Sequence, residues 1–301
     1  MISESGKIPC STAAAAVSAG KSTNQYTFSR RASICATYAF LIGGMLLSVL
    51  PFGISLITSL RTEQDLAAAG PLALPAALTA ENYIVLFTEH AFYVPLAVTL
   101  QMVGVIVFGQ LFTSVLAAYA FARLRFPGRE VIFWLYLATL MIPAAILMIP
   151  LFSGAAAFGL RNTFAGLVVP FMFGSPYAIF LLRENFRAIP QEILDAAKLD
   201  GAGNWRQLFA IVLPMSRPII VTLLLISIVT QWNSFMWPKI IAPDSAWHVL
   251  SVAASALQTQ YTANWTLVMS AAAVTILPLL LVFIIFNRQI MRSLGAITSA
   301  Q

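Results

Sequence analysis

Six stretches of this 301-residue sequence run for 21 residues or more without a Lys, Arg, Asp or Glu. A helix needs roughly 20 apolar residues to cross about 30 Å of hydrocarbon, so each stretch is long enough to span a bilayer. The whole chain is 59% hydrophobic and only 9% charged, whereas soluble domains carry about 25% charged residues. A water-soluble globular fold is therefore excluded.

These stretches also lack the two-residue alternation of a membrane β-barrel. Backbone amides in lipid must find partners within their own segment, which leaves helices as the solution. The sequence therefore predicts an all-α integral membrane protein with six transmembrane helices. We expect them over residues 35–57, 94–121, 131–152, 164–182, 219–237 and 266–286.

The distribution of basic residues predicts the orientation. Six spans put both termini on one side, and the segments of that side hold fourteen of the 17 Lys and Arg residues; the other side holds Arg61, Arg161 and Lys239. Basic loops face the cytoplasm, so both termini are expected there, in a multi-pass membrane protein surrounded by lipid. This bias accounts for the net charge of +6 without a nucleic-acid partner.

The first 33 residues differ from the remainder because they are rich in Ser, Ala and Lys and contain no apolar run. We interpret residues 1–33 as a disordered cytoplasmic leader and residues 34–301 as the transmembrane domain. The apolar run that follows is too long for a signal peptide and is expected to remain as the first span. Cys10 and Cys35 suggest no disulfide framework.

A search for catalytic chemistry returns no candidate residue and no metal site. The predicted spans contain no Asp, Glu, Lys, Arg or His, and the two histidines, His90 and His248, are expected in external loops, too far apart in sequence for a ligand motif. The nearest approach to a phosphate-binding loop, residues 154–159, is followed by Leu160 and Arg161 instead of Lys and Ser or Thr. We therefore expect a non-enzyme without a cofactor of its own, and if nucleotide drives it, a partner subunit performs the hydrolysis.

The loop between the fourth and fifth spans, residues 183–218, is the longest cytoplasmic loop and holds nine charged residues. Its pattern predicts a short helix, a glycine corner and a second short helix. The features are Pro190 at the first helical position, an apolar stripe of Ile193, Leu194 and Ala197, breaks at Gly201 and Gly203, and a capping box of Asn204 and Gln207. Such an elbow suits docking of another protein, but an amphipathic helix lying on lipid headgroups has the same pattern.

Resemblance to a known family favours docking. The run 195–202, Asp-Ala-Ala-Lys-Leu-Asp-Gly-Ala, with Ile-Val-Leu-Pro at 211–214, closely resembles the EAA loop of the membrane subunits of bacterial ABC importers. In that family the loop is a coupling helix seated in a cleft of the ATPase subunit, its leading acid pairing with a basic residue and its glycine forming the bend. The resemblance assigns ATPase coupling to Asp195, Ala196, Ala197, Asp200, Gly201, Ala202, Leu213 and Pro214. Asp195 stands where the family usually has the longer Glu, so an ion pair there requires closer approach.

Further runs narrow the resemblance to the maltose-type and glycerol-3-phosphate-type permeases. They are residues 118–129 (Ala-Tyr-Ala-Phe-Ala-Arg-Leu-Arg-Phe-Pro-Gly-Arg), 141–143 and 232–238, and the likeness extends over about residues 82–292. It implies a channel-forming subunit that works with a second, different permease and an ATPase homodimer that binds ATP and Mg²⁺. An external binding protein delivers a sugar or a sugar-like solute, glycerophospho-compounds included. The coupling loop would be the lever, with helices continuing through Pro214 and Pro218 into the fifth span.

Uncharged polar residues within the spans suit a neutral solute rich in hydroxyl groups. The candidate path residues are Gln101, Gln110, Thr230, Gln231, Trp232, Asn233 and Ser234. An interfacial aromatic belt with interhelical hydrogen bonds explains the same residues. By resemblance, Gln258, Gln260 and Tyr261 would contact the binding protein, and the alternative is a segment that lies on the membrane surface.

A self-sufficient secondary transporter is the competing class. Such transporters have broken helices in matched halves and ions within the membrane. Pro170, Gly174 and Pro176 interrupt the predicted fourth span, but no matched interruption is evident in the other half.

Overall fold

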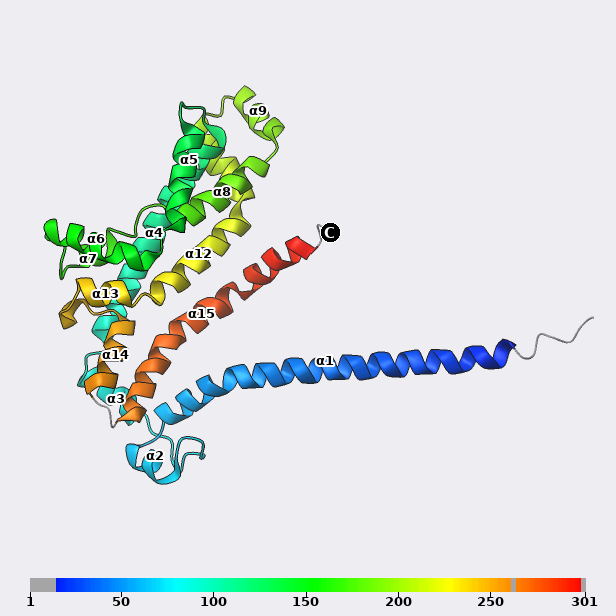
Figure 1. Cartoon of the computed structure of the whole chain (residues 1–301), viewed down its shortest axis with the longest axis vertical. Coiled ribbons are helices and arrows are strands. Elements are labelled where there is room, and N and C mark those ends of the chain that lie inside the picture. The colour runs from blue at the N-terminus through cyan, green and yellow to red at the C-terminus, as the bar shows by residue number, and fades with distance from the viewer. Residues whose placement is uncertain (1–14, 261–263, 299–301) are drawn as a thin grey trace, which may run out of the picture. The chain divides into compact units, whose positions relative to one another are not determined.

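The structure, a computed structural model, describes the backbone of residues 15–260 and 264–298 and the side chains of residues 34–258 and 264–286. Within these ranges the chain is helical and contains no strand (Figure 1). Its internal contacts divide it into two units, residues 1–57 and 58–301. The all-helical prediction is therefore confirmed for the described residues.

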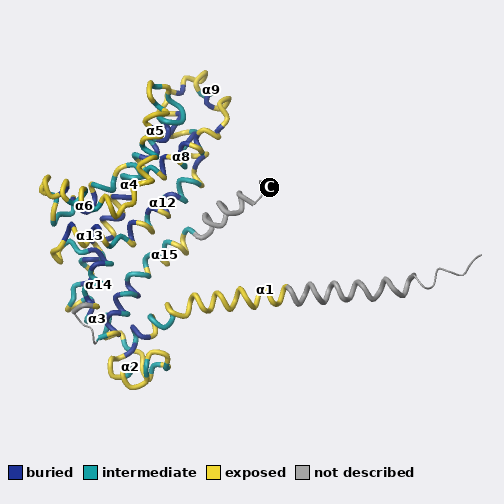
Figure 2. The backbone as a smooth tube through the Cα atoms, viewed as in Figure 1, coloured by how far each residue is buried: buried dark blue, intermediate teal, exposed yellow. Residues whose placement is uncertain are grey.

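The described residues of the first unit belong to α1 (Ala15–Ser59), which continues through Pro51 and whose last two residues fall in the second unit. Its segment Ile34–Ser59 is apolar and long enough to span a bilayer, and none of its most apolar window is buried (Figure 2). An apolar helix without cover requires lipid or protein around it. α1 starts within residues 1–33, and the division into a leader and a transmembrane domain stays a prediction.

Two further predicted spans are single helices in the second unit. They are α4 (Tyr93–Arg123) and the apolar part, Trp265–Phe286, of α15 (Trp265–Thr298). Together with α1, three helices among the described residues are long and apolar enough to cross a membrane, and two bent helix pairs raise the number to at most five.

The first bent pair corrects the predicted third span. In place of one helix over residues 131–152, α5 (Arg129–Ala138) and the short η1 (Thr139–Met141) meet α6 (Ala144–Ala157) at 104°. The bend lies at Pro143, which disfavours a helical conformation in the residue before it.

The predicted helix over residues 219–237 likewise ends early. α12 (Arg217–Trp232) stops at Trp232, and α13 (Met236–Ile241) follows after a short break. α12 also forms the second bent pair, at 79° to the helical segment 204–215 before it.

The fourth predicted span, residues 164–182, is not one helix. It is divided into α7 (Phe164–Val168) and α8 (Pro176–Ala188), with non-helical residues 169–175 between them. Side chains from other helices bind backbone groups in this break: the amide of Ser175 donates to Ser114 Oγ over 3.1 Å, and the Tyr136 hydroxyl donates to the carbonyl oxygen of Gly174. These bonds satisfy groups that would otherwise be costly in lipid.

The second unit is built around α4, against which α8 and α12 pack closely. One hydrophobic core, the α8-side core, joins the C-terminal half of α4 to α5, α8 and α12. The other, the α14-side core, joins the N-terminal half of α4 to α3 (Glu81–Thr88), α14 (Leu250–Gln260) and α15. The helices α2 (Glu63–Ala69) and η3 (Ser245–Trp247) complete the fold.

Candidate functional site

The segment that the sequence singled out, the coupling loop of residues 183–218, forms a helix, a corner and a second helical segment. Its first helix, α9, spans Gln191–Leu199, with Pro190 as its N-cap. Leu194 alone is buried in α9, in the α8-side core. Ile193 is 40% exposed and Ala197 is half-buried, so Leu194 is the one member of the predicted apolar stripe that the described part of the chain buries. One leucine thus anchors α9, and the other faces remain open (Figure 2).

The corner at Gly201 has the geometry expected of a glycine that ends a helix. Its φ is +80°, its amide donates to the carbonyl oxygen of Lys198 over 2.9 Å, and the Ala202 amide donates to that of Ala197 over 2.8 Å. This pair of bonds is the Schellman motif, which requires a left-handed residue that a side chain strains. The predicted helix–glycine–helix elbow is therefore confirmed in its backbone.

The second helical segment differs from the prediction. Asn204 is the first residue of α10 (Asn204–Gln207) and not its N-cap, which is Gly203. Gln207 is buried and its Nε2 donates to the carbonyl oxygen of Ala202 over 2.7 Å, so it fixes the corner from behind. The π-helical η2 (Leu208–Val212) and α11 (Leu213–Met215) follow, with Pro214 in α11.

The helical segment of residues 204–215 leads into α12 through a sharp bend. A break at Ser216 separates α11 from α12, and the two sides meet at 79°. Pro214 and Pro218 have no amide proton to donate, which accounts for the irregular turns around them. The predicted continuation of the helices through Pro214 and Pro218 is therefore corrected, because it is broken at Ser216.

Asp195 is exposed on α9 and paired within its own helix. Its Oδ1 accepts hydrogen bonds from Gln191 Nε2 at 3.0 Å and from Lys198 Nζ at 3.2 Å. These contacts, Gln191 first, hold the pKa of the Asp195 carboxyl below its ordinary value. The Asp195 carboxylate is therefore ionised at neutral pH and accessible to a partner. The side chains of Ala196 and Asp200 are exposed as well.

Two exposed aromatic residues beside the corner are not among the site residues predicted from the sequence. Trp205 and Phe209 stack with ring centroids 6.0 Å apart, and they are 66% and 51% exposed. Leu199 is 91% exposed. Large apolar side chains around a cluster of charges are typical of a protein interface. The signal available was the spacing of four residues between the two aromatic rings, which puts them on one helical face.

The candidate path residues do not form one cluster. Gln231 and Trp232 are buried, and the Trp232 indole donates to the carbonyl oxygen of Thr275 over 3.0 Å. Gln110 accepts a hydrogen bond from Ser227 Oγ at 3.0 Å. The others are exposed or half-buried: Gln101, Thr230 and Asn233 are exposed, and Ser234 is half-buried with a carbonyl oxygen bound by Ser251 Oγ at 2.7 Å.

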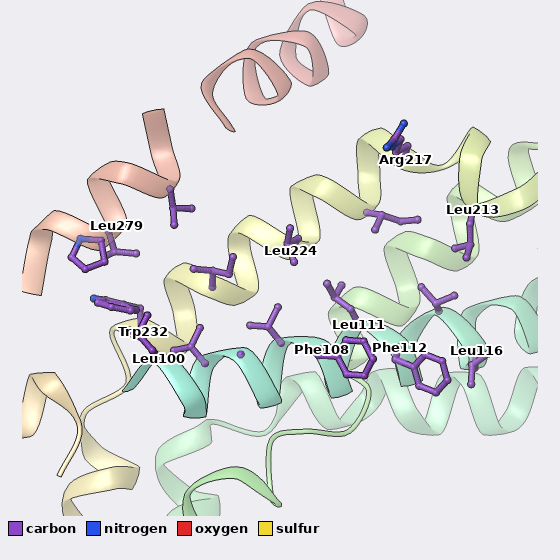
Figure 3. Close-up of a pocket in the computed structure, with 18 of the residues that line it drawn as sticks. Leu100, Phe108, Leu111, Phe112, Leu116, Leu213, Arg217, Leu224, Trp232 and Leu279 are labelled. Atoms are coloured by element: carbon purple, nitrogen blue, oxygen red, sulfur yellow. The ribbon is translucent and has the colours of Figure 1, made fainter. Parts of the chain in front are cut away.

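A groove of about 900 Å³ lies between α4, α12 and α15 (Figure 3). Of the candidate path residues, Trp232 lines it. Trp232 and Arg217 are the two members of its lining with polar side-chain groups, and the remainder are apolar residues such as Leu111 and Leu224. Phe209, next to the corner, lies at the same groove, so the coupling loop and the helices α4 and α12 share one surface.

Of the residues predicted to contact a binding protein, Gln258 is exposed near the end of α14. The Gln260 side chain and Tyr261 lie outside the described residues. The two histidines, separated in sequence, line the same pocket of about 400 Å³, and His248 Nε2 lies 3.1 Å from the carbonyl oxygen of Pro243.

Comparison with known proteins identifies the family. Residues 110–295 match the family described as "Binding-protein-dependent transport system inner membrane component". The chain is 30% identical over 265 residues to the diacetylchitobiose uptake system permease protein NgcG of Streptomyces coelicolor, covering 86% of each protein. It is 31% identical over 247 residues to the arabinooligosaccharides transport system permease protein AraQ of Halalkalibacterium halodurans, covering 80% of this chain and 88% of that relative.

A third relative is the sn-glycerol-3-phosphate transport system permease protein UgpE of Yersinia pestis bv. Antiqua, 29% identical over 268 residues, with 85% of this chain and 94% of the relative covered. Among solved structures, a bacterial ABC transporter involved in the import of the acidic polysaccharide alginate has the same fold. The TM-score is 0.77 at 21% identity, covering 86% of this chain and 97% of that one. The match over most of its length, together with apolar helices long enough to span a bilayer, shows that this chain belongs to the family of binding-protein-dependent inner membrane components, the multi-pass permease subunits of ABC importers.

Proposed function

We propose that this chain forms the channel of an ATP-driven importer for a sugar or sugar-like solute, and that the corner at Gly201 is where a separate ATPase acts on it. One observation carries the proposal: the segment resembling the EAA loop folds into an exposed helix that ends in a Schellman corner, with a charged residue, Asp195, and two aromatic rings facing outward. This surface is built for a protein partner of mixed apolar and charged character.

The membrane arrangement that we propose has six spans and both termini in the cytoplasm. Three of the spans are the long helices α1, α4 and α15, a fourth is the bent pair of α5 and α6, and a fifth is α12 without residues 204–215, which belong to the coupling loop. The sixth is the broken segment α7–α8, whose freed backbone groups are bound by Ser114 and Tyr136. Broken helices are tolerated in membranes where protein covers the irregular part. The excess of Lys and Arg in the terminal-side segments supports the orientation.

The partners that we propose are two copies of one ATPase, a second and different permease, and an external solute-binding protein. ATP and Mg²⁺ would be bound by the ATPase, since this sequence lacks a phosphate-binding loop. The two permeases would enclose the path, with Gln258 and its neighbours near the binding protein. A self-sufficient secondary transporter is the rival function, and it predicts activity without any of these partners.

The proposed solute class follows from the relatives and from the polar residues of the spans. NgcG, AraQ and UgpE are named for diacetylchitobiose, arabinooligosaccharides and glycerol 3-phosphate, which all carry several hydroxyl groups. Gln101, Gln110 and Asn233 offer amides that hydrogen-bond hydroxyl groups, and Trp232 offers an aromatic face. Binding of the cognate external protein to a panel of sugars and glycerophosphodiesters would identify the solute.

The test compares two glycines of the corner. Gly201 has φ +80° and Gly203 has φ −69°, and no atom lies within 4 Å of a Cβ built on either. A β-branched residue is strained only at the positive φ. Gly201→Val should therefore reduce uptake and substrate-stimulated ATP hydrolysis together while membrane insertion persists, and Gly203→Val should change both far less. Purification in mild detergent should also recover an ATPase and a second permease, whereas recovery as a lone active transporter would reject the proposal.

A further inference from the structure

The end of α4 is attached directly to the coupling loop through one side chain. Arg123, the last residue of α4, donates from Nη1 to Gln191 Oε1 over 2.8 Å and from Nη2 to the carbonyl oxygens of Ile189, at 2.6 Å, and of Phe186. Gln191 is the first residue of α9, and Phe186 and Ile189 lie at the C-terminal end of α8. One guanidinium therefore joins three helices.

The charge on Arg123 is balanced by a helix end. Among the described residues, no carboxylate lies within ion-pair distance of it, and its acceptors are the last carbonyl groups of α8 and one neutral amide. A cation at a helix C-terminus is favoured by the helix dipole. Arg123 Nε is buried without a hydrogen-bond partner, which is an unfavourable arrangement for stability alone.

The contact continues to the proposed ATPase-facing carboxylate. Gln191 accepts from Arg123 with Oε1 and donates with Nε2 to Asp195 Oδ1 at 3.0 Å. A single amide thus connects the end of α4 to the residue that leads the EAA-like segment. A displacement of α9 along this line acts on α4 through two hydrogen bonds.

α8 joins α9 over Ile189 and Pro190, but the covalent route from α9 onward to α12 is less direct. It passes through the Gly201 corner, the π-helical η2 and the break at Ser216 before α12 begins, with a bend of 79°. Irregular turns of this kind absorb movement. The route through Arg123 crosses no loop and reaches α4, which supplies one wall of the apolar groove through residues such as Leu111 (Figure 3).

We propose that Arg123 is a positioning residue that transmits movement of α9 to α4, so that the ATPase acts on α4 through this guanidinium in addition to α8 and α12, which the chain joins to the two ends of the coupling segment. The inference rests on the proposed function. The planar guanidinium is required because its fork reaches separate acceptors on α8 and α9 at the same time, which a lysine ammonium does not reproduce.

The experiment uses the full transporter in proteoliposomes and measures solute imported per ATP hydrolysed. Arg123→Lys should lower this ratio by about five- to tenfold, the effect expected when charge-assisted hydrogen bonds are lost, while the ATPase still binds and hydrolyses ATP. Arg125→Lys is the matched control: it lies two residues away, is exposed, and should leave the ratio unchanged.

Variants at Gln191 separate transmission from folding and keep the test informative if Arg123→Lys does not insert. Gln191→Leu loses both hydrogen bonds and should lower the ratio, whereas Gln191→Glu keeps the acceptor for Arg123, loses only the bond to Asp195, and should lower the ratio less. Combining Arg123→Lys with Gln191→Leu should lower the ratio by less than the product of the two separate effects, because both changes remove the contact between Arg123 and Gln191. A purely structural role would lower uptake and ATP hydrolysis in parallel with an unchanged ratio, and that result, or an unchanged ratio in Gln191→Leu, overturns the proposal.

Failure of the underlying function would give a different result. If the unmodified chain imports solute without an ATPase, the proposed function is wrong. If the unmodified transporter couples normally and Arg123→Lys couples equally well, only the role of Arg123 is wrong.

Discussion

Arg183 Nη2 donates to both carboxylate oxygens of Glu130, at 2.8 and 2.7 Å, and thereby joins α8 to α5. The guanidinium carbon lies 3.9 Å from the centroid of the Phe133 ring, and the Arg183 side chain is almost fully buried. This arrangement fixes α8 directly before it leads into the coupling loop.

Replacement of Arg183 should therefore destabilise the fold. Arg183→Ala loses the bidentate pair and the packing on Phe133, and we expect a loss of about 2–3 kcal/mol in the free energy of unfolding. Arg187→Ala is the matched control on the same helix, because Arg187 is 53% exposed and its one ion pair, with Glu184, measures 3.8 Å. Thermal unfolding in detergent measures both, and equal melting temperatures for the two variants would contradict the assignment.

Gly166 should not tolerate a side chain. A Cβ there would lie 2.1 Å from the carbonyl oxygen of Leu160, and the Gly166 carbonyl oxygen accepts the Trp237 indole at 3.0 Å. Gly166→Ala should cost roughly 1–3 kcal/mol through overpacking. Gly154→Ala in α6 has open space around it and should be neutral or slightly stabilising. A melting temperature of Gly166→Ala that matches that of Gly154→Ala would show that the backbone at Gly166 can move away from the Leu160 carbonyl oxygen, against this prediction.

The loop after α1 should become less stable in acid. The buried Arg61 donates from Nε to Asp65 Oδ2 over 2.7 Å, and this contact holds the pKa of Asp65 below its ordinary value. A lowered folded-state pKa contributes stability that is present above the unfolded value near 3.9 and is lost as the pH falls through the folded value. Protease resistance of this loop should therefore drop below about pH 4, and Asp65→Asn should be less resistant with no such pH step. A step of the same size in Asp65→Asn would assign it to another group.

Asp195 should act as a fixed charge. Because Gln191 and Lys198 lower its pKa, it remains ionised throughout pH 5–8, and binding of the ATPase should not change with the state of this carboxyl in that range. Asp195→Asn should weaken binding by a constant factor across those pH values and reduce its dependence on salt. A difference between the two proteins that grows with pH near neutrality would mean that the carboxyl titrates there, against this account.

The exposed indole of Trp205 should contribute most to ATPase affinity. Aromatic side chains in the centre of an interface commonly carry much of the binding energy, so Trp205→Ala should raise the Kd by about tenfold or more. Phe158→Ala removes a ring that is more exposed, at 84%, at the end of α6, and should leave the Kd unchanged. Matching Kd values for the two variants would place Trp205 outside the interface.

Local rules predicted the corner of the coupling loop well. A glycine after nine helical residues is the usual end of a helix, and Gly201 adopts the conformation that this requires. The burial of α9 was less predictable, because Leu194 and Ile193 are neighbours of equal hydrophobicity and only tertiary packing decides that Leu194 is the buried one. The same reason hides Gln207, a polar residue that is buried because it binds the carbonyl oxygen of Ala202.

Charge-free length predicted where apolar helices occur but not whether they are continuous. Pro143, Pro170 and Pro176 signal interruptions, yet a proline in a membrane helix often only kinks it. The break between α7 and α8 is stable because Ser114 and Tyr136, from α4 and α5, bind its free backbone groups. Those partners are 38 residues or more away in sequence, so no local pattern reveals them. The attachment of Arg123 to Gln191, 68 residues away, is hidden for the same reason.

The most direct test of the central claim is photo-cross-linking from the outward face of α9. A benzoylphenylalanine probe at Ala196, which is exposed beside Asp195, should capture in membrane vesicles a protein that mass spectrometry identifies as a nucleotide-hydrolysing subunit. The same probe at Phe158 should not capture it. Capture of lipid alone at Ala196, with no ATPase in the product, would contradict the account.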